Sequence, residues 1–238
     1  MGKVISLHGG EFYRRTSTTL LEKGLEEVLH KNYEQALYSF KEAYRFNNDN
    51  EQAYFYIGLV SYIVGDVKES MNIFKELVEL HPDNQEYMYR YARGIYEMEG
   101  KNKVKCLHYF LKIERTNPYF FQARLFLARL LIEQKKFKRA ETLLRYLVEH
   151  DGYFQHEYLF ELASISIMKE NYNEALQILH ACIKRNPTYS IAYYVAYDLY
   201  MKLGEKEKAV SLLDRLVSVC PKESDIAKQR LYMSQMRN

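Results

Sequence analysis

The residue types that most often carry out enzyme chemistry occur in this sequence, but not at the spacings that such chemistry requires. Seven histidines are spread over 238 residues, and none forms the HExxH pattern that binds catalytic zinc from one face of a helix. A Gly-rich phosphate loop and the GxSxG turn of serine hydrolases are also missing. We therefore expect a chain with no metal site, no cofactor and no enzymatic activity.

The three cysteines are the remaining candidate nucleophiles. Cys106, Cys182 and Cys220 form no CxxC motif, and their odd number does not suggest a disulfide framework. They fit a reduced, cytoplasmic protein whose thiols pack in the core. The first 15 residues lack the apolar run of a secretory signal, and no run of about 18 apolar residues predicts a membrane-spanning helix.

A repeat in the sequence predicts the helices that carry the histidines and cysteines. The string "NYEQAL" at 32–37 returns as "NYNEAL" at 171–176. From Ala36 onward, a small residue is followed by apolar residues four and seven positions later, and this pattern recurs at intervals of 34, 36, 34, 35 and 34 residues. Such spacing marks one face of an amphipathic helix. The eighteen marker positions are Ala36, Phe40, Ala43, Ser70, Phe74, Leu77, Cys106, Phe110, Ile113, Ala140, Leu144, Leu147, Ala175, Leu179, Cys182, Ala209, Leu213 and Leu216.

A second helix precedes the marker helix in each repeat. A small residue stands twelve positions before the marker at Gly24, Gly58, Ala128 and Ala163, and fourteen positions before it at Ala92. Short polar turns such as "VGDV" and "LGEK" separate the two helices. Each repeat is therefore predicted to be a helix–turn–helix unit.

A period of 34 residues built from two helices resembles the tetratricopeptide repeat family. The stretches "AYFYIGLVSYIVGDVKES" and "AYYVAYDLYMKLGEKEKA" follow the family pattern closely. The resemblance implies an all-α fold, a right-handed α-solenoid of helix-turn-helix units with a C-terminal capping helix. We assign six units to about 17–50, 51–84, 85–120, 121–155, 156–189 and 190–223. Residues 1–16 are predicted to be a flexible N-terminal arm, and residues 224–238 the capping helix.

The resemblance also implies a binding site, because in this family the first helix of each unit lines a concave groove. The matching positions are Phe55, Tyr62, Tyr89, Arg93, Tyr96, Leu125, Arg129, Phe160 and Tyr194. The alternative is that these residues only pack helix against helix. Glutamates four residues further on predict the ion pairs Arg93–Glu97 and Arg129–Glu133.

The charges predict a second surface. Residues 101–145 hold 12 Lys and Arg against 3 Asp and Glu, whereas residues 17–100 hold 8 against 15. Equivalent turns of a solenoid stack along one edge, so the lysine-rich turns of the third and fourth units are expected to form one basic edge. Its residues are Lys101, Lys103, Lys105, Lys135, Lys136, Lys138 and Arg139.

Two interpretations of the basic edge remain: it aids solubility, or it docks an acidic protein. Phe137 is the only aromatic residue within it, whereas single-stranded nucleic acid is bound with interleaved aromatic side chains. We therefore expect neither nucleic acid nor a membrane as partner.

The sequence thus predicts a non-catalytic scaffold or adaptor that binds a peptide or partner protein in the groove. The aromatic groove positions and the two arginines predict a ligand with apolar anchors and an acidic residue. A peptide-sensing regulatory protein and a non-catalytic subunit of an enzyme complex are the alternatives.

Overall fold

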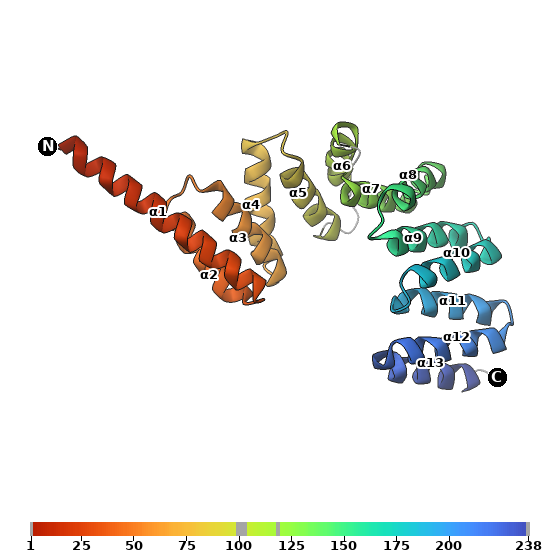
Figure 1. Cartoon of the computed structure of the whole chain (residues 1–238). Coiled ribbons are helices and arrows are strands. Elements are labelled where there is room, and N and C mark those ends of the chain that lie inside the picture. Colours follow the sequence, from red (N-terminus) through yellow and green to blue (C-terminus); the bar gives the residue numbers. More distant parts are fainter. Residues whose placement is uncertain (1, 99–103, 118–119, 237–238) are drawn as a thin grey trace. The chain divides into compact units, whose positions relative to one another are not determined.

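The computed structural model describes residues 2–98, 104–117 and 120–236, and within these ranges the regular structure is entirely helical (Figure 1). This confirms the predicted all-α fold. The described helices are α1 (Gly2–Leu29), α2 (Tyr33–Phe46), α3 (Glu51–Ile63), α4 (Val67–Leu80), α5 (Gln85–Met98), α6 (Val104–Thr116), α7 (Phe121–Glu133), α8 (Phe137–His150), α9 (Gln155–Met168), α10 (Tyr172–Arg185), α11 (Ser190–Lys202), α12 (Lys206–Val219), the short 3-10 helix η1 (Pro221–Glu223) and α13 (Ser224–Met236).

The chain divides into two compact units, Met1–Thr116 and Asn117–Asn238. Helices α1 to α6 belong to the first unit and helices α7 to α13 to the second. Within each unit the helices follow one another as pairs, and each pair packs on the next. The stacking of helix pairs is the solenoid architecture that the repeat period predicts.

The core is built from the repeat positions. None of the eighteen marker residues exposes more than 3% of its surface. They lie on the second helix of each pair, where the spacing of four and seven residues places them on one face. Burying a large apolar side chain contributes about 1.5–3 kcal/mol, so these faces supply much of the driving force for stacking.

The turn within most pairs ends the first helix with a residue in left-handed conformation. The φ angles are 62° at Lys31, 94° at Gly65, 58° at Lys135, 60° at Glu170 and 80° at Gly204. At Lys135 the backbone N–H donates to the carbonyl of Ile132 at 2.8 Å, and the next N–H donates to Leu131 at 2.8 Å. These two bonds are the Schellman motif, which satisfies the last carbonyls of the helix and reverses the chain.

Tyrosine hydroxyls connect elements that lie far apart in the sequence. Tyr54 donates to Glu76 at 2.5 Å, and Tyr87 donates to Glu51 at 2.5 Å from the following helix pair. A ring buried at its base with a hydroxyl at its tip suits such a bond between packed helices. The unusual number of tyrosines, 23 in the chain, therefore serves structure as well as recognition.

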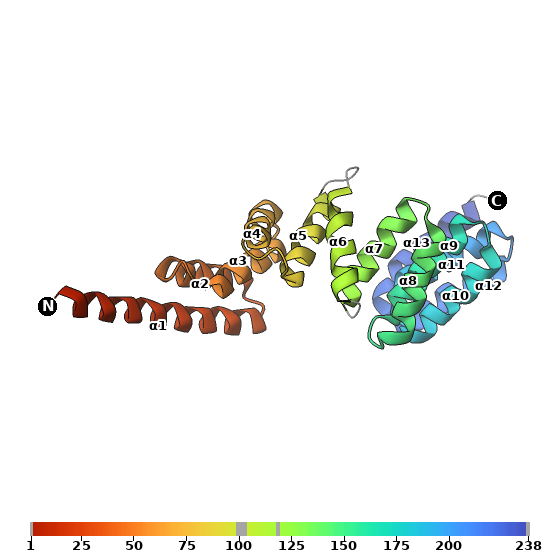
Figure 2. The ribbon, with the colours of Figure 1, turned by 90° about the horizontal axis from the view of Figure 1, so that it is seen from above.

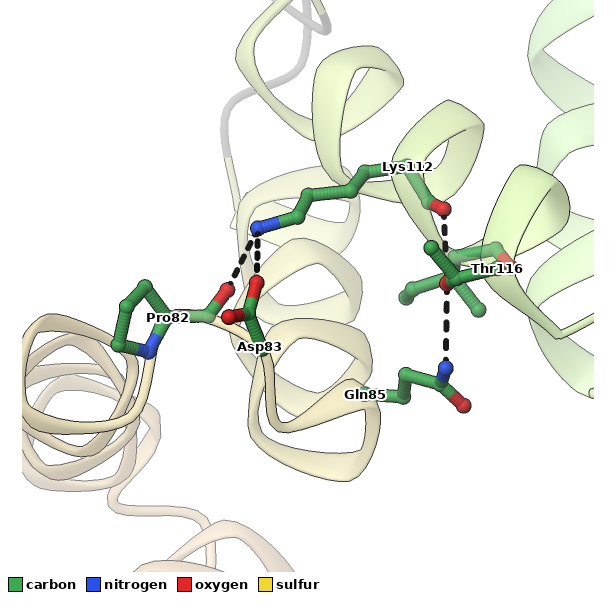
Figure 3. A network of polar contacts seen from close by, with 6 residues as sticks. Pro82, Asp83, Gln85, Lys112 and Thr116 are labelled. Carbon is green, nitrogen blue, oxygen red and sulfur yellow. Dashed lines mark hydrogen bonds and ion pairs between the residues drawn. The ribbon is translucent and has the colours of Figure 1, made fainter.

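Polar side chains also connect α6 to the loop before α5 (Figure 3). Lys112 donates to the carbonyl of Pro82 at 2.7 Å and to the carboxylate of Asp83 at 2.9 Å. Nearby, Gln85 donates to the hydroxyl of Thr116 at 3.1 Å. These bonds hold α6 beside the start of α5.

The first helix corrects the prediction of a flexible arm over residues 1–16. Helix α1 begins at Gly2 and continues to Leu29, and its N-terminal half extends past the end of α2 (Figures 1 and 2). No proline interrupts these residues, and Arg15 pairs with Glu11 one turn earlier at 2.5 Å. Two adjacent glycines weaken a helix without stopping it.

Burial of α1 against α2 begins near Ser17, one turn after the exposed Tyr13 ring contacts the Phe46 ring at 6.1 Å between centroids. The buried Ser17 hydroxyl donates to the carbonyl of Ala43 at 2.7 Å. The predicted boundary at residue 17 therefore lies where burial against α2 begins, and not where the helix begins.

Helix α13 covers the last pair. Ala227 is fully buried in the same cluster as Leu212, Leu213 and Leu216 of α12. The apolar face of α12 is thereby shielded from solvent, which is what a terminal repeat of a solenoid requires.

Candidate functional site

A largely apolar cavity of about 410 Å³ lies between α3, α4 and α5 in the first unit. Its lining includes two of the predicted groove residues, Tyr62 and Arg93, and seven further residues. The full lining is Leu59, Tyr62, Ile63, Ser70, Met71, Phe74, Arg90, Arg93 and Gly94. An apolar cavity with a few polar groups is the usual form of a ligand site in proteins.

Tyr62, Arg93 and Glu97 form a polar cluster at this cavity. The Tyr62 hydroxyl donates to the Glu97 carboxylate, and Arg93 Nε donates to the same carboxylate at 2.9 Å. The Arg93 guanidinium also lies 5.0 Å from the centre of the Tyr62 ring, a cation–π contact. Burial, and then the hydrogen bond to Glu97, raise the pKa of the Tyr62 hydroxyl, so it remains a donor. The predicted pair Arg93–Glu97 is confirmed.

Arg90 is a second arginine of the cavity that the sequence reasoning missed. Its Nε donates to Glu86 at 2.6 Å, and its guanidinium lies 5.4 Å from the centre of the Tyr89 ring. The side chains of Arg90 and Arg93 are 30% and 32% exposed, so both remain accessible. Their spacing of three residues on α5 was the signal that could have identified Arg90.

Gly94 and Met71 close the cavity where α5 approaches α4. A Cβ atom on Gly94 would lie 2.9 Å from Met71 Cγ, which is closer than a normal contact. Methionine has a flexible and polarisable side chain that adapts to different apolar ligands. This wall of the cavity can therefore change shape.

Two predicted groove residues are corrected to packing positions. Tyr89 is only 5% exposed and its ring contacts Phe110 of α6 at 6.4 Å between centroids. Leu125 is 6% exposed within α7. Both stand at the fifth position of their helices, which here faces the neighbouring helix and not solvent.

Phe55 and Tyr96 are half-buried in the first unit. The Phe55 ring lies 5.8 Å from Phe74 and 5.5 Å from Tyr87, so it joins α3 to α4 and α5. Its main contacts are therefore between helices, as the alternative interpretation of the groove residues supposed.

Arg129 lies in the second unit and differs from the prediction. Its ion pairs lead to the next helix pair, with Glu161 at 2.6 Å and Glu157 at 3.6 Å. The expected pairing with Glu133 on the same helix is replaced by these contacts to α9. Two carboxylates neutralise the guanidinium, which leaves little attraction for an acidic ligand.

The remaining groove residues of the second unit are engaged as well. Phe160 meets the edge of the Tyr189 ring at 5.7 Å. Tyr194 donates to Glu223 at 2.6 Å, and the Arg230 guanidinium of α13 lies 4.6 Å from its ring centre. Arg230 also pairs with Asp198 at 2.9 Å, so the capping helix covers this part of α11.

The basic edge is only partly described. Lys101 and Lys103 lie outside the described residues, and Lys105 is exposed on α6 of the first unit. Four exposed residues surround the turn between α7 and α8 of the second unit, namely Lys135, Lys136, Lys138 and Arg139. A single patch across both units remains a prediction.

Two of the three cysteine side chains pack in the core. Cys106 and Cys182 are fully buried. Burial raises the pKa of the Cys182 thiol to about 12, and its sulfur donates to the carbonyl of His156 at 3.1 Å. A protonated, enclosed thiol is a poor nucleophile. Among the described residues, no group of three or more His, Cys, Asp or Glu side chains is arranged to hold a metal ion.

Within the same described ranges, no helix combines the length and apolar character needed to cross a membrane.

Comparison with solved structures gives the same fold. A tetratricopeptide repeat protein from Parabacteroides merdae is 20% identical, with a TM-score of 0.70 over 86% of this chain and 80% of that one. PilW, described as a widely conserved type IV pilus biogenesis factor, is 18% identical, with a TM-score of 0.72 over 86% and 94%. YrrB, described as a protein with an unusual peptide-binding site, is 19% identical, with a TM-score of 0.58 over 74% and 89%.

Comparison with curated proteins finds no match. Two family models described as tetratricopeptide repeat match residues 126–190 and 166–231. These matches fall on α7 to α13, and the first unit carries the same buried marker positions at the same period. The family-model matches thus identify residues 126–231 as tetratricopeptide repeats.

Proposed function

We propose that this chain is a non-catalytic scaffold that binds a peptide segment of a partner protein in the cavity between α3, α4 and α5. The observation that carries the proposal is this apolar cavity of about 410 Å³ with two accessible arginines in its lining. The tetratricopeptide repeat fold is typical of protein–protein interaction scaffolds, and YrrB is described as having a peptide-binding site. Both points support the proposal.

The apolar residues that line the cavity favour a large apolar side chain of the ligand. Leu59, Met71 and Phe74 line the cavity, and Phe74 is 3% exposed, so it forms a fixed wall. Met71 is the adaptable one. A large aliphatic or aromatic side chain of the ligand fits this surface, because its burial supplies affinity without polar partners.

The arginines select an acidic residue beside the anchor. Ion pairs four residues apart on a helix are worth about 0.2–0.5 kcal/mol. A hydrogen bond between charged groups contributes about 1.5–3 kcal/mol in a partly buried site. A ligand carboxylate can therefore compete with Glu97 for Arg93.

An adaptor role in the cytoplasm is part of the proposal. Cys106, Cys182 and Cys220 are all free thiols, which suits a reducing compartment. The engaged state of Arg129 and Tyr194 supports the first unit as the main binding surface. We expect neither nucleic acid nor a membrane to bind in this cavity.

Selection of peptides from a random library against the intact chain tests this function. We expect enriched peptides to share a large apolar residue and a nearby acidic residue. Binding of a selected peptide, measured by calorimetry, should weaken about tenfold or more with Arg93→Ala, a loss of about 1.4 kcal/mol. Tyr62→Ala should also weaken it.

Arg45→Ala is the matched control. Arg45 is an exposed arginine of α2 that pairs with Glu42 at 2.6 Å and lies outside the cavity. Its removal changes the net charge equally and should leave affinity unchanged. Selected peptides that tolerate both Arg93→Ala and Tyr62→Ala would show that the partner binds elsewhere.

A further inference from the structure

A second cavity, of about 410 Å³, lies between α10, α11 and α12 in the second unit. It is separate from the site proposed above, because no residue lines both. Its polar lining consists of His180, Tyr200, Glu207, Lys208, Ser211 and Arg215.

The first unit has a cavity at the equivalent place, between α2, α3 and α4. Residues in the two places are related by the repeat offset of 139 positions, so His180, Lys208 and Arg215 correspond to Lys41, Glu69 and Glu76. In the first unit, Lys41 pairs with Glu69 at 2.8 Å and Glu76 accepts from Tyr54 at 2.5 Å. Each of these three charged side chains therefore has a partner within the first unit.

The second unit reverses two of these charges. Lys208 stands in place of Glu69 and Arg215 in place of Glu76. Lys208 pairs with Glu205 at 2.5 Å. The Arg215 guanidinium makes no hydrogen bond or ion pair with any residue that the structure describes, although it lines an open cavity.

The groups around Arg215 are suited to an anion. The His180 ring shares a hydrogen bond of 2.7 Å with the Tyr200 hydroxyl. Burial, and then the nearby charge of Arg215, lower the pKa of His180. Ser211 lies one turn from Arg215 on the same face of α12 and offers a hydroxyl.

Glu207 is the opposing charge. It lies eight residues before Arg215 on α12, which separates the two by about 12 Å along the helix axis. At the Arg215 end of the cavity, a bound anion would therefore meet the unpaired Arg215 guanidinium, the Ser211 hydroxyl and the His180 imidazole, which can take up a proton. One available cation matches a single negative charge better than a phosphate dianion.

We propose that the cavity between α10, α11 and α12 binds a carboxylate from an acidic side chain of a partner protein, with Arg215 as its charge partner. Guanidinium and carboxylate form paired, charge-assisted hydrogen bonds of matching geometry. The bound carboxylate also favours the protonated form of His180.

The probe is the blocked tripeptide acetyl-Gly-Glu-Gly-amide, followed by NMR of the intact chain at constant ionic strength. We expect a saturable shift of the His180 ring signals and an increase of its pKa. The neutral analogue acetyl-Gly-Gln-Gly-amide should produce neither. Arg215→Gln should weaken the response about tenfold or more.

Arg185→Gln is the matched control, because Arg185 is an exposed arginine of α10 outside the cavity. It should change the affinity less than twofold. Equal binding of the neutral tripeptide, or unchanged binding by Arg215→Gln, would overturn the proposal. Saturation by inorganic phosphate at a tenfold lower concentration would instead assign the cavity to phosphate groups.

Discussion

The hydroxyl of Tyr62 on α3 donates a hydrogen bond to the carboxylate of Glu97 on α5, 35 residues later in the chain. Glu97 also accepts from Arg93 at 2.9 Å. One carboxylate therefore holds two of the polar groups, Tyr62 and Arg93, that the apolar cavity would offer to a ligand. It competes with any acidic residue of a bound peptide.

Removal of that competitor should strengthen binding. Glu97→Gln removes the ion pair between Arg93 and Glu97, so an acidic peptide selected against the chain should bind about 1.4- to 2.3-fold more tightly, as expected from pair energies of about 0.2–0.5 kcal/mol. Calorimetry measures the change. Glu79→Gln, which removes an exposed carboxylate paired with Lys75 at 3.6 Å, should leave affinity unchanged. Weaker binding by Glu97→Gln would mean that Glu97 positions Arg93 for the ligand.

A buried carboxylate makes the loop before α9 sensitive to a single hydroxyl. Tyr158, 1% exposed, donates to Asp151, which is 5% exposed. Tyr158→Phe leaves that carboxylate without its side-chain donor and should destabilise the protein by about 1–3 kcal/mol. Urea unfolding measures this. Tyr153→Phe is the control, because Tyr153 is 88% exposed. Equal unfolding midpoints for the two variants would contradict the prediction.

Two glycines should respond differently to the same substitution. A Cβ on Gly58 would lie 2.9 Å from Ile73 Cγ2 and 3.0 Å from Phe74 Cζ, which are rigid and buried. Gly58→Ala should therefore destabilise by about 1–3 kcal/mol, although alanine has the higher helix propensity. A Cβ on Gly94 meets the flexible Met71 side chain, and Ala gains helix propensity of about 1 kcal/mol. Gly94→Ala should be close to neutral, and equal losses in thermal unfolding would refute this distinction.

The left-handed turn residues offer a stabilising change. Lys135 has a φ of 58°, a conformation that costs about 1–2 kcal/mol for a residue with a Cβ. Lys135→Gly removes that strain and should raise stability by about 0.5–1 kcal/mol, after the greater flexibility of glycine in the unfolded chain is included. Lys136→Gly, at a φ of −84°, should bring no gain. An increase for Lys136→Gly alone, in urea unfolding, would contradict the assignment.

His180 should make stability depend on pH. Burial, and then the Arg215 charge, lower its pKa from 6.5 in the folded state. The unfolded chain therefore binds a proton first, and stability should decrease as pH falls below about 6.5. His180→Gln should flatten this decrease between pH 7 and 5. Arg215→Gln removes one cause of the shift and should reduce the slope. An unchanged slope in both variants would exclude His180 as its source.

The sequence alone determined the helix pairs and their core. Every marker residue of the 34-residue pattern is buried, because helix periodicity is local and its apolar face has only one stable place in a stack. Cys106 and Cys182 follow the same rule, which is why their packing role was predictable. The pair Arg93–Glu97 was predictable too, since both residues stand on one helix.

The tertiary structure decided which side chain meets which across helices. Arg129 has Glu133 four residues away, yet it pairs with Glu161 on the next helix pair. Contacts between residues about 20 to 35 positions apart determine other features as well. These are the burial of Tyr89, the packing of Arg230 over Tyr194, and the cavities beside Arg93 and Arg215. Such contacts are set by the rotation and spacing of neighbouring helices. A helical period places a residue on a face, but only the packed neighbour determines what that face touches.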